Sequence, residues 1–171
     1  MLSESAKMSS AAEARFRVQA PNSQPRAITV IALDAPGEDV VRRLSADPWT
    51  HATFLTAAGV SEGARSRVAS DDLMVPLRDL SGQPRTLSDE VSTADLIVMV
   101  ASAEGNAHAA EAIGRACSLR RVTTTTLLVG ATESTDTALS TTLAQLRPWS
   151  LMLVLARDEA YIRDMLTALR A

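Results

Sequence analysis

The sequence predicts a three-layer α/β/α sandwich with a Rossmann-like, mostly parallel sheet. Short, nearly continuous apolar runs rich in β-branched residues are typical of strands covered on both faces. A helical pattern follows each run, and this strand–helix alternation indicates a parallel sheet with right-handed crossovers. The strongest predicted strands are Ala27–Leu33, Leu96–Ala101, Val122–Val129 and Leu151–Leu155.

Each main helix is predicted directly after one of these strands. The second of them is rich in alanine and glycine, and such small side chains allow a helix to approach a sheet closely. Cys117 is interpreted as one more small buried residue of this helix. The predicted helices are Gly37–Ser45, Ala107–Leu119, Asp136–Leu146 and Glu159–Ala171.

Weaker elements are expected between the first and second strong strands. They are two strands at Ala52–Thr56 and Leu73–Leu77, an exposed loop at Val60–Asp72, a turn at Ser81–Pro84 and a short helix at Thr86–Thr93. The sheet should then have about six strands, in the order 3-2-1-4-5-6 when numbered along the chain.

Length and composition indicate a single domain over residues 26–171, preceded by a disordered tail over residues 1–25. Aromatic residues make up 3% of the 171 residues and the net charge is −3. Both values argue against a nucleic-acid partner. One cysteine excludes an internal disulfide framework and a Cys-rich zinc site, and the cytoplasm is the simplest compartment. Neither a membrane span nor a signal peptide is expected.

The fold predicts where a ligand would bind. In an open parallel sheet, ligands bind outside the carboxyl ends of the strands, at the point where the strand order reverses. That point lies between the loops that follow the first and fourth predicted strands. The candidate ligand-binding residues there are Asp34, Gly37, Asp39, Ser102, Glu104, Gly105, Asn106 and His108.

These loops are acidic, which disfavours a phosphate ligand. Free N–H groups at a helix N-terminus favour an anion, but a close exposed carboxylate opposes this by roughly 1 kcal/mol. A nucleotide is therefore possible but disfavoured, no cofactor is assigned, and no metal site is predicted. The same acids fit a second interpretation, in which they only cap helices. Asp34 or Ala35 precedes Pro36, Asp158 precedes Glu159, and the cluster Ser134-Thr135-Asp136 stands at the start of the third predicted helix.

No catalytic constellation is found in the sequence. The nucleophile elbow, the paired-histidine zinc motif, the P-loop and the dinucleotide fingerprint are all absent. His108 could act as an acid–base group at the strand-order reversal, or could be an incidental residue in the first turn of a helix. Whether the chain is an enzyme is left open, and the lack of a nucleophile–base pair favours a non-catalytic protein.

One stretch of the sequence resembles a known family. The segment "ITVIALDAPGEDVVRRL" (residues 28–44) is similar to the opening strand, loop and helix of the tubulin-like bacterial cell-division GTPases of the FtsZ family. In that family the strand enters a run of glycines, followed by an asparagine and a helix with a late arginine. Gly37, Asp39 and Arg43 fall at or near these positions.

A second stretch carries the same resemblance. The segment "ADLIVMVASAEGNAHAAEAIGRACSLRRVTTTTLLVG" (residues 94–130) is similar to the strand, phosphate loop, small-residue helix and strand of that family. Gly105, Asn106 and His108 fall in the phosphate-loop stretch. The resemblance covers roughly residues 27–156 and implies a nucleotide-binding domain. Shared Rossmann-like architecture would produce a similar match.

Departures from the family pattern change what the resemblance implies. The first loop keeps one glycine, and the phosphate loop lacks its glycine and threonine run and has gained Glu104. The family's second domain is expected to be missing, since these 171 residues match only the nucleotide-binding half. That domain carries the catalytic loop, so GTP hydrolysis in the family's manner should be lost. The resemblance therefore implies a half-length relative with a degenerate pocket.

Two functions remain open at this point. The first is a non-catalytic binding or interaction protein that self-associates or acts with a larger partner. Its acidic strand-end face and arginine-bearing opposite edge would suit head-to-tail contacts. The second is a small enzyme or sensor that binds a polar small molecule or divalent metal through Asp34, Glu104, Asn106 and His108.

Overall fold

The computed structural model describes residues 25–58 and 75–171. These residues form a seven-stranded sheet with the order β4-β3-β2-β1-β5-β6-β7. β1 pairs in parallel with β2 and β5, and β6 pairs in parallel with β5 and β7, whereas β3 is antiparallel to β2 and β4. The strands are β1 (Ile28–Ala32), β2 (Ala52–Thr56), β3 (Pro76–Asp79), β4 (Pro84–Thr86), β5 (Leu96–Ser102), β6 (Thr123–Val129) and β7 (Met152–Leu155).

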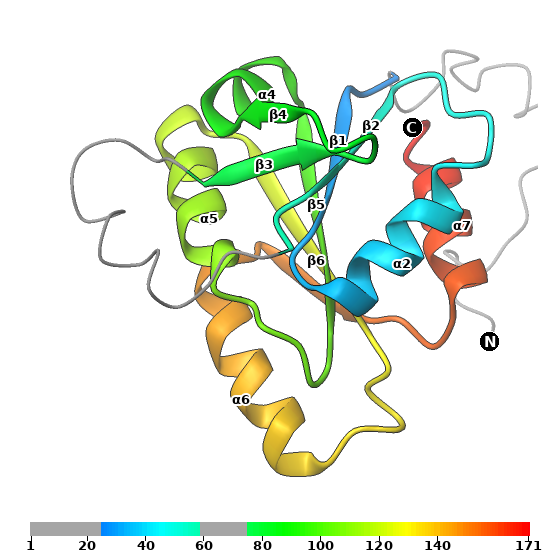
Figure 1. Ribbon diagram of the computed structural model, residues 1–171, viewed down its shortest axis with the longest axis vertical. Coiled ribbons are helices and arrows are strands. Elements are labelled where there is room, and N and C mark those ends of the chain that lie inside the picture. The colour runs from blue at the N-terminus through cyan, green and yellow to red at the C-terminus, as the bar shows by residue number, and fades with distance from the viewer. Residues whose placement is uncertain (1–24, 59–74) are drawn as a thin grey trace, which may run out of the picture.

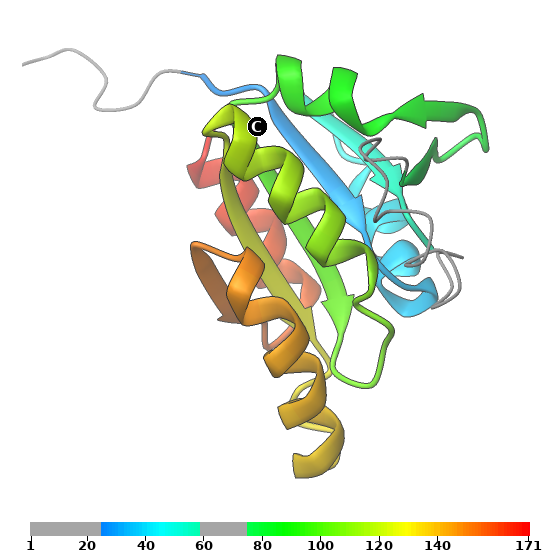
Figure 2. The ribbon, with the colours of Figure 1, turned by 90° about the vertical axis from the view of Figure 1, so that its left-hand side faces the viewer.

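Helices cover both faces of the sheet, which confirms the three-layer α/β/α architecture (Figures 1 and 2). α2 and α7 pack on one face, and α4, α5 and α6 pack on the other. The helices are α2 (Ala35–Leu44), α4 (Leu87–Thr93), α5 (Ala109–Arg120), α6 (Asp136–Leu146), the 3-10 helix η3 (Arg147–Trp149) and α7 (Glu159–Ala168).

The buried residues of β1 alternate between the two cores. Ile28 and Val30 belong to the core under α2 and α7, whereas Ile31 belongs to the core under α5. All five residues of the strand are buried. This two-sided burial is the reason why the strand has an almost continuous apolar sequence.

Most predicted elements are found close to their predicted bounds. β2 and α6 match the predictions residue for residue, and the four strong strands lie at the predicted positions to within one residue at each end. α2 begins two residues earlier than predicted, α5 begins two residues later, and α7 ends at Ala168 instead of Ala171. These are ordinary end effects of helix capping and fraying.

The number and full order of the strands differ from the prediction because β4 was missed. Part of the segment expected to be a turn, Ser81–Pro84, instead begins an edge strand. The Asp79 carboxylate accepts N–H bonds from Ser81 and Gln83, which closes a hairpin between β3 and β4. Proline is tolerated in β4 because no further strand pairs with its outer side among the described residues.

Some predictions lie wholly or partly outside the described residues. The expected disordered tail and the expected loop at Val60–Asp72 fall there, apart from residue 25. The strand predicted at Leu73–Leu77 is found as β3, which begins at Pro76. Over the described ranges, no helix is long and apolar enough to cross a membrane.

A close approach between α5 and η3 fixes the orientation of the chain before β7. A Cβ atom at Gly114 would lie 2.6 Å from the Trp149 Cβ. The guanidinium carbon of Arg115 lies 5.7 Å from the centre of the Trp149 ring, so the ring packs against the helix from two consecutive residues. Glycine at position 114 therefore serves packing, since a glycine inside a helix is otherwise unfavourable.

Gly114→Ala tests this packing. Helix propensity alone would stabilise the variant by about 1 kcal/mol, but the added methyl group must displace the Trp149 Cβ, which is not the end of a flexible side chain. We expect a net loss of roughly 1–3 kcal/mol in the free energy of unfolding, measured by urea denaturation. Ser118→Ala, on an exposed position one turn later, is the control. A Gly114→Ala protein as stable as the parent would contradict the packing role.

Candidate functional site

The corner between β1 and α2 is organised by Asp34. Asp34 is the N-cap of α2, and its Oδ1 accepts the N–H of Gly37 at 2.7 Å. Pro36 stands in the first turn, where its missing N–H costs no hydrogen bond. This geometry confirms the capping interpretation of Asp34.

The same carboxylate reaches across the point where the strand order reverses. Asp34 Oδ2 accepts the Ser102 N–H at 2.8 Å and the Ser102 Oγ–H at 2.9 Å at the end of β5. The Leu33 N–H also donates to the Val100 carbonyl at 2.9 Å. Asp34 is only 6% exposed. One buried carboxylate thus joins the loop after β1 to the end of β5.

Two of the predicted site glycines pack against this carboxylate. A Cβ at Gly105 would lie 1.6 Å from Asp34 Oδ2, and a Cβ at Gly37 would lie 2.8 Å from Asp34 Oδ1. Both backbones approach so closely that no side chain fits. Asp34, Gly37, Ser102 and Gly105 therefore come together as predicted, but their polar groups bind one another.

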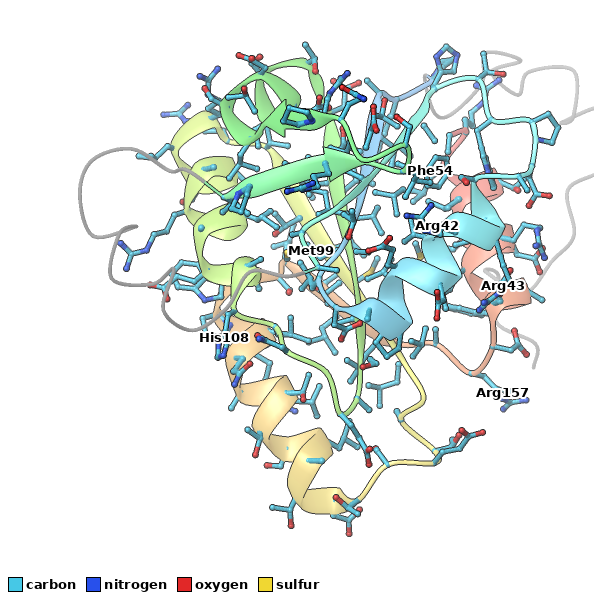
Figure 3. The ribbon with its side chains drawn as sticks, viewed as in Figure 1. Arg42, Arg43, Phe54, Met99, His108 and Arg157 are labelled. Atoms are coloured by element: carbon cyan, nitrogen blue, oxygen red, sulfur yellow. The ribbon has the colours of Figure 1, made fainter. Side chains whose placement is uncertain are left out.

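The remaining candidate residues lie around this cluster. Asp39, Glu104 and Asn106 are exposed. Asn106 Oδ1 accepts the His108 N–H at 2.9 Å, which forms a turn before α5. His108 is half-buried and lies just before α5, at the left of Figure 3, and its Nδ1 is buried without a hydrogen-bond partner among the described residues. The part of the chain that the structure describes holds no group of three metal-ligating side chains.

A second polar network surrounds Glu38, on the side of β1 where β2 lies. The sequence did not predict a site there. Glu38 Oε2 accepts the Thr56 hydroxyl at 2.8 Å, and Oε1 accepts an Arg42 N–H at 2.6 Å. Arg42 also donates to the Leu80 carbonyl at 2.9 Å, so α2 is tied to the β3–β4 hairpin. The i,i+4 spacing predicts the Glu38–Arg42 pair, but no sequence signal predicts the contact with Thr56.

A cavity of about 370 Å³ adjoins this network. It lies between the first turns of α2, the end of β2 and the β3–β4 hairpin. The side chain of the exposed Arg78 has no hydrogen-bond or ion-pair partner among the described residues. The lining residues are Glu38, Arg42, Thr56, Ala58, Pro76, Arg78, Asp79 and Gly82, and none of them was a predicted site residue.

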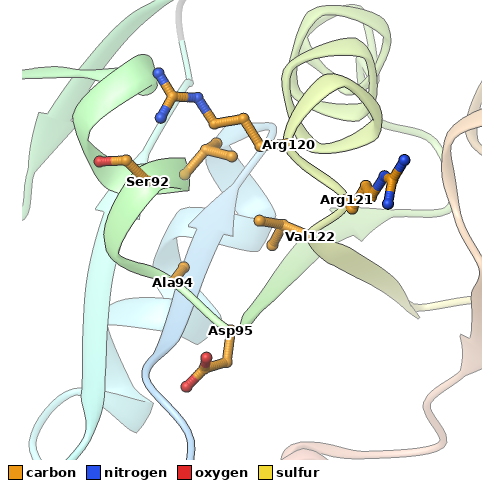
Figure 4. A pocket seen from close by; sticks show the side chains of 7 residues that line it. Ser92, Ala94, Asp95, Arg120, Arg121 and Val122 are labelled. Carbon is orange, nitrogen blue, oxygen red and sulfur yellow. The ribbon is translucent and has the colours of Figure 1, made fainter.

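A larger cavity of about 520 Å³ lies at the opposite end of the sheet, near the amino ends of β5 and β6 (Figure 4). Arg120 and Arg121 at the end of α5 contribute to its wall, beside Ser92 and Asp95. Arg120 donates to the Ser88 hydroxyl, and the Asp95 carboxylate accepts the Ala27 N–H. These side chains therefore connect elements of the fold.

No family model matches the chain, and no curated protein matches it.

Asp34→Asn tests the role of the buried carboxylate. An amide group replaces one acceptor oxygen with a donor, so a donor would face either the Gly37 N–H or the Ser102 groups. We expect a loss of roughly 1–3 kcal/mol in the free energy of unfolding. Asp39→Asn, on an exposed residue of the same helix, should change it by less than about 0.5 kcal/mol. Equal effects of the two substitutions would contradict this role.

Glu38 should make stability depend on pH. Burial alone would raise the pKa of Glu38, but the hydrogen bonds from Thr56 and Arg42 and the Arg42 charge lower the pKa below its usual value of 4.5. The Glu38 contribution is therefore present above pH 4.5 and is lost as the pH falls through the lower folded-state pKa.

The measurement compares the parent protein with Glu38→Gln across this range. The stability advantage of the parent over Glu38→Gln, measured by urea denaturation, should shrink as the pH is lowered from 6 to below 4. Asp39→Asn, which removes an exposed acid without these bonds, should give a smaller change. A parent advantage that does not vary with pH would contradict the assignment.

Proposed function

We propose that the chain is a non-catalytic interaction protein built on a Rossmann-like domain. Its ligand crevice is filled by one of its own side chains, that of Asp34. The observation that carries the proposal is the Asp34 carboxylate, which accepts hydrogen bonds from Gly37 and Ser102 at the reversal of strand order. In proteins that bind a phosphate at this place, such donors face the ligand. Here an internal anion satisfies them.

The packing of Gly105 supports the same proposal. The loop after β5 lies directly against the Asp34 carboxylate, with no space for even one methyl group at position 105. A phosphate could approach these donors only after Asp34 and the loop had moved. Such a movement would expose a negative charge next to the incoming anion, which opposes binding. The degenerate nucleotide pocket that the resemblance implies is therefore proposed to be a structural joint.

A protein of this kind would act through its surface, with itself or with a larger partner. A cytoplasmic location and the absence of nucleic-acid and membrane partners remain predictions from composition. The alternative function, a small enzyme or sensor with a polar ligand, has one supporting observation. The cavity beside Glu38 is lined by Arg42, Thr56 and Arg78, and the Arg78 side chain has no partner among the described residues.

Ligand titration tests the closed crevice. GTP, GDP, ATP and NAD at about 1 mM should each shift the melting temperature by less than about 1 °C. A ligand with a micromolar Kd would add about 4 kcal/mol and several degrees at that concentration. Calorimetry should likewise detect no binding. Clear micromolar stabilisation by any of the four would overturn the proposal.

Asp34→Ser tests whether removal of the Asp34 carboxylate opens the crevice to phosphate. Serine can still cap α2, but it removes the internal anion and leaves donors of Gly37 and Ser102 available. We expect inorganic phosphate at about 50 mM to stabilise Asp34→Ser more than it stabilises the parent. Asp39→Ser controls for the general stabilising effect of phosphate salts. Equal phosphate effects on all three proteins would count against closure by Asp34.

A further inference from the structure

The two edges of the sheet differ in how well they are protected. β4 has three residues, one of which is Pro84, and Arg85 forms an ion pair with Glu90 beside it. Proline and charge are the usual devices that prevent an edge strand from pairing with another chain. β7, at the other edge, is flanked by apolar residues, has no proline or charge, and no strand pairs with its outer side among the described residues.

Exposed apolar side chains gather at β7. Leu151 is 80% exposed, Leu155 is 51% exposed and Met152 is 45% exposed. Leu153 and Val154, which are partly buried, pack into the cores on opposite faces. Because side chains alternate along a strand, Leu151 and Leu155 lie on the face of Leu153, and Met152 lies on the face of Val154. A monomer would leave this apolar edge in water.

The helix on the Leu153 face also lacks the charges of a solvent-facing surface. α6 has one charged residue, Asp136, among its eleven residues. Only Thr142 and Leu146 in the C-terminal half are buried, and the helix extends beyond the sheet in both views (Figures 1 and 2). An exposed helix normally carries charges on its outer face. α6 and β7 together thus carry few charges, with Asp136 at the start of the helix and Arg147 between the two elements.

The sequence of this edge is complementary to itself. Residues 151–155 read Leu-Met-Leu-Val-Leu, which is nearly symmetric about Leu153. In an antiparallel pair of two copies centred on Leu153, Leu151 lies opposite Leu155 and Met152 lies opposite Val154. Each apolar side chain therefore meets an apolar partner on the same face of the joined sheet.

The charges that flank β7 lie outside the segment proposed to pair. Arg147 lies before the strand, Arg157 and Asp158 lie after it, and all three are exposed. A two-fold axis at Leu153 brings the Arg147 end of one copy toward the Arg157–Asp158 end of the other. Each end therefore brings together one acid and two arginines, and the apolar residues 151–155 carry the pairing.

We propose that two copies of this chain associate through β7, in an antiparallel pair centred on Leu153, with α6 beside the joint. The inference rests on the proposed function in one respect, that the chain acts through protein contacts. The partner is a second copy of the chain, and the contact surface is β7. The contact is isologous, so the assembly closes at two copies.

Sedimentation of the full chain, with a paired variant, tests the proposal. The parent at about 50 μM should sediment as a dimer of twice 18.2 kDa. Leu151→Lys with Leu155→Lys places lysines opposite each other at both ends and should weaken the dimer at least about tenfold. Thr86→Lys with Ser92→Lys adds the same charge at exposed positions of β4 and α4 and should leave the dimer intact.

Hydrogen exchange provides the second measurement. Those amides of residues 151–155 that do not donate to β6 should be protected in the parent and should exchange faster in the Leu151→Lys and Leu155→Lys protein. A cooperative melting transition of the variant shows that the domain remains folded. A monomeric parent, a larger assembly, or a dimer that survives both substitutions would overturn the inference. If the parent is a monomer and binds no nucleotide, the pairing through β7 is wrong and the closed crevice stands. If the parent is a dimer and binds a nucleotide, the closed crevice is wrong and the pairing through β7 stands.

Discussion

The arrangement of the domain at its strand ends depends on one buried carboxylate. Asp34 starts α2, holds the end of β5 by accepting from the N–H and the hydroxyl of Ser102, and is covered by Gly105. An unpaired carboxylate in this position would be costly, because desolvation penalises charge that is not compensated by hydrogen bonds. The three donors make its burial possible. The two central parallel strands are thereby joined where a Rossmann-like domain usually keeps space for a ligand.

The polar network around Glu38 depends on the position that Asp34 gives to α2. Once Asp34 sets the start of α2, Glu38 is one turn along the helix and faces Thr56 at the end of β2. Arg42, one further turn along, reaches the Leu80 carbonyl. α2 therefore contacts β5, β2 and the β3–β4 hairpin through polar side chains on successive turns. The cavity beside Glu38 is bounded by these fixed contacts.

The fold was largely predictable because its signals are local. Apolar runs predicted β1, β5, β6 and β7, and capping residues predicted where α6 and α7 begin. The internal use of the site was not predictable, because Asp34 and Ser102 are 68 positions apart and meet only through the β1–β5 register. The exposed β4 has no apolar pattern, so its pairing depends on the turn at Asp79.

The protected edge at β4 sets a limit on growth by strand addition. Pro84 removes one backbone donor from the outermost strand, and the strand is only three residues long. A sheet that is open to strand pairing at both edges could add further chains on both sides and polymerise without limit, as amyloid-forming segments do. With the β4 edge blunted, the described sheet favours further strand pairing only along β7, and one short hairpin therefore opposes growth of the sheet in both directions.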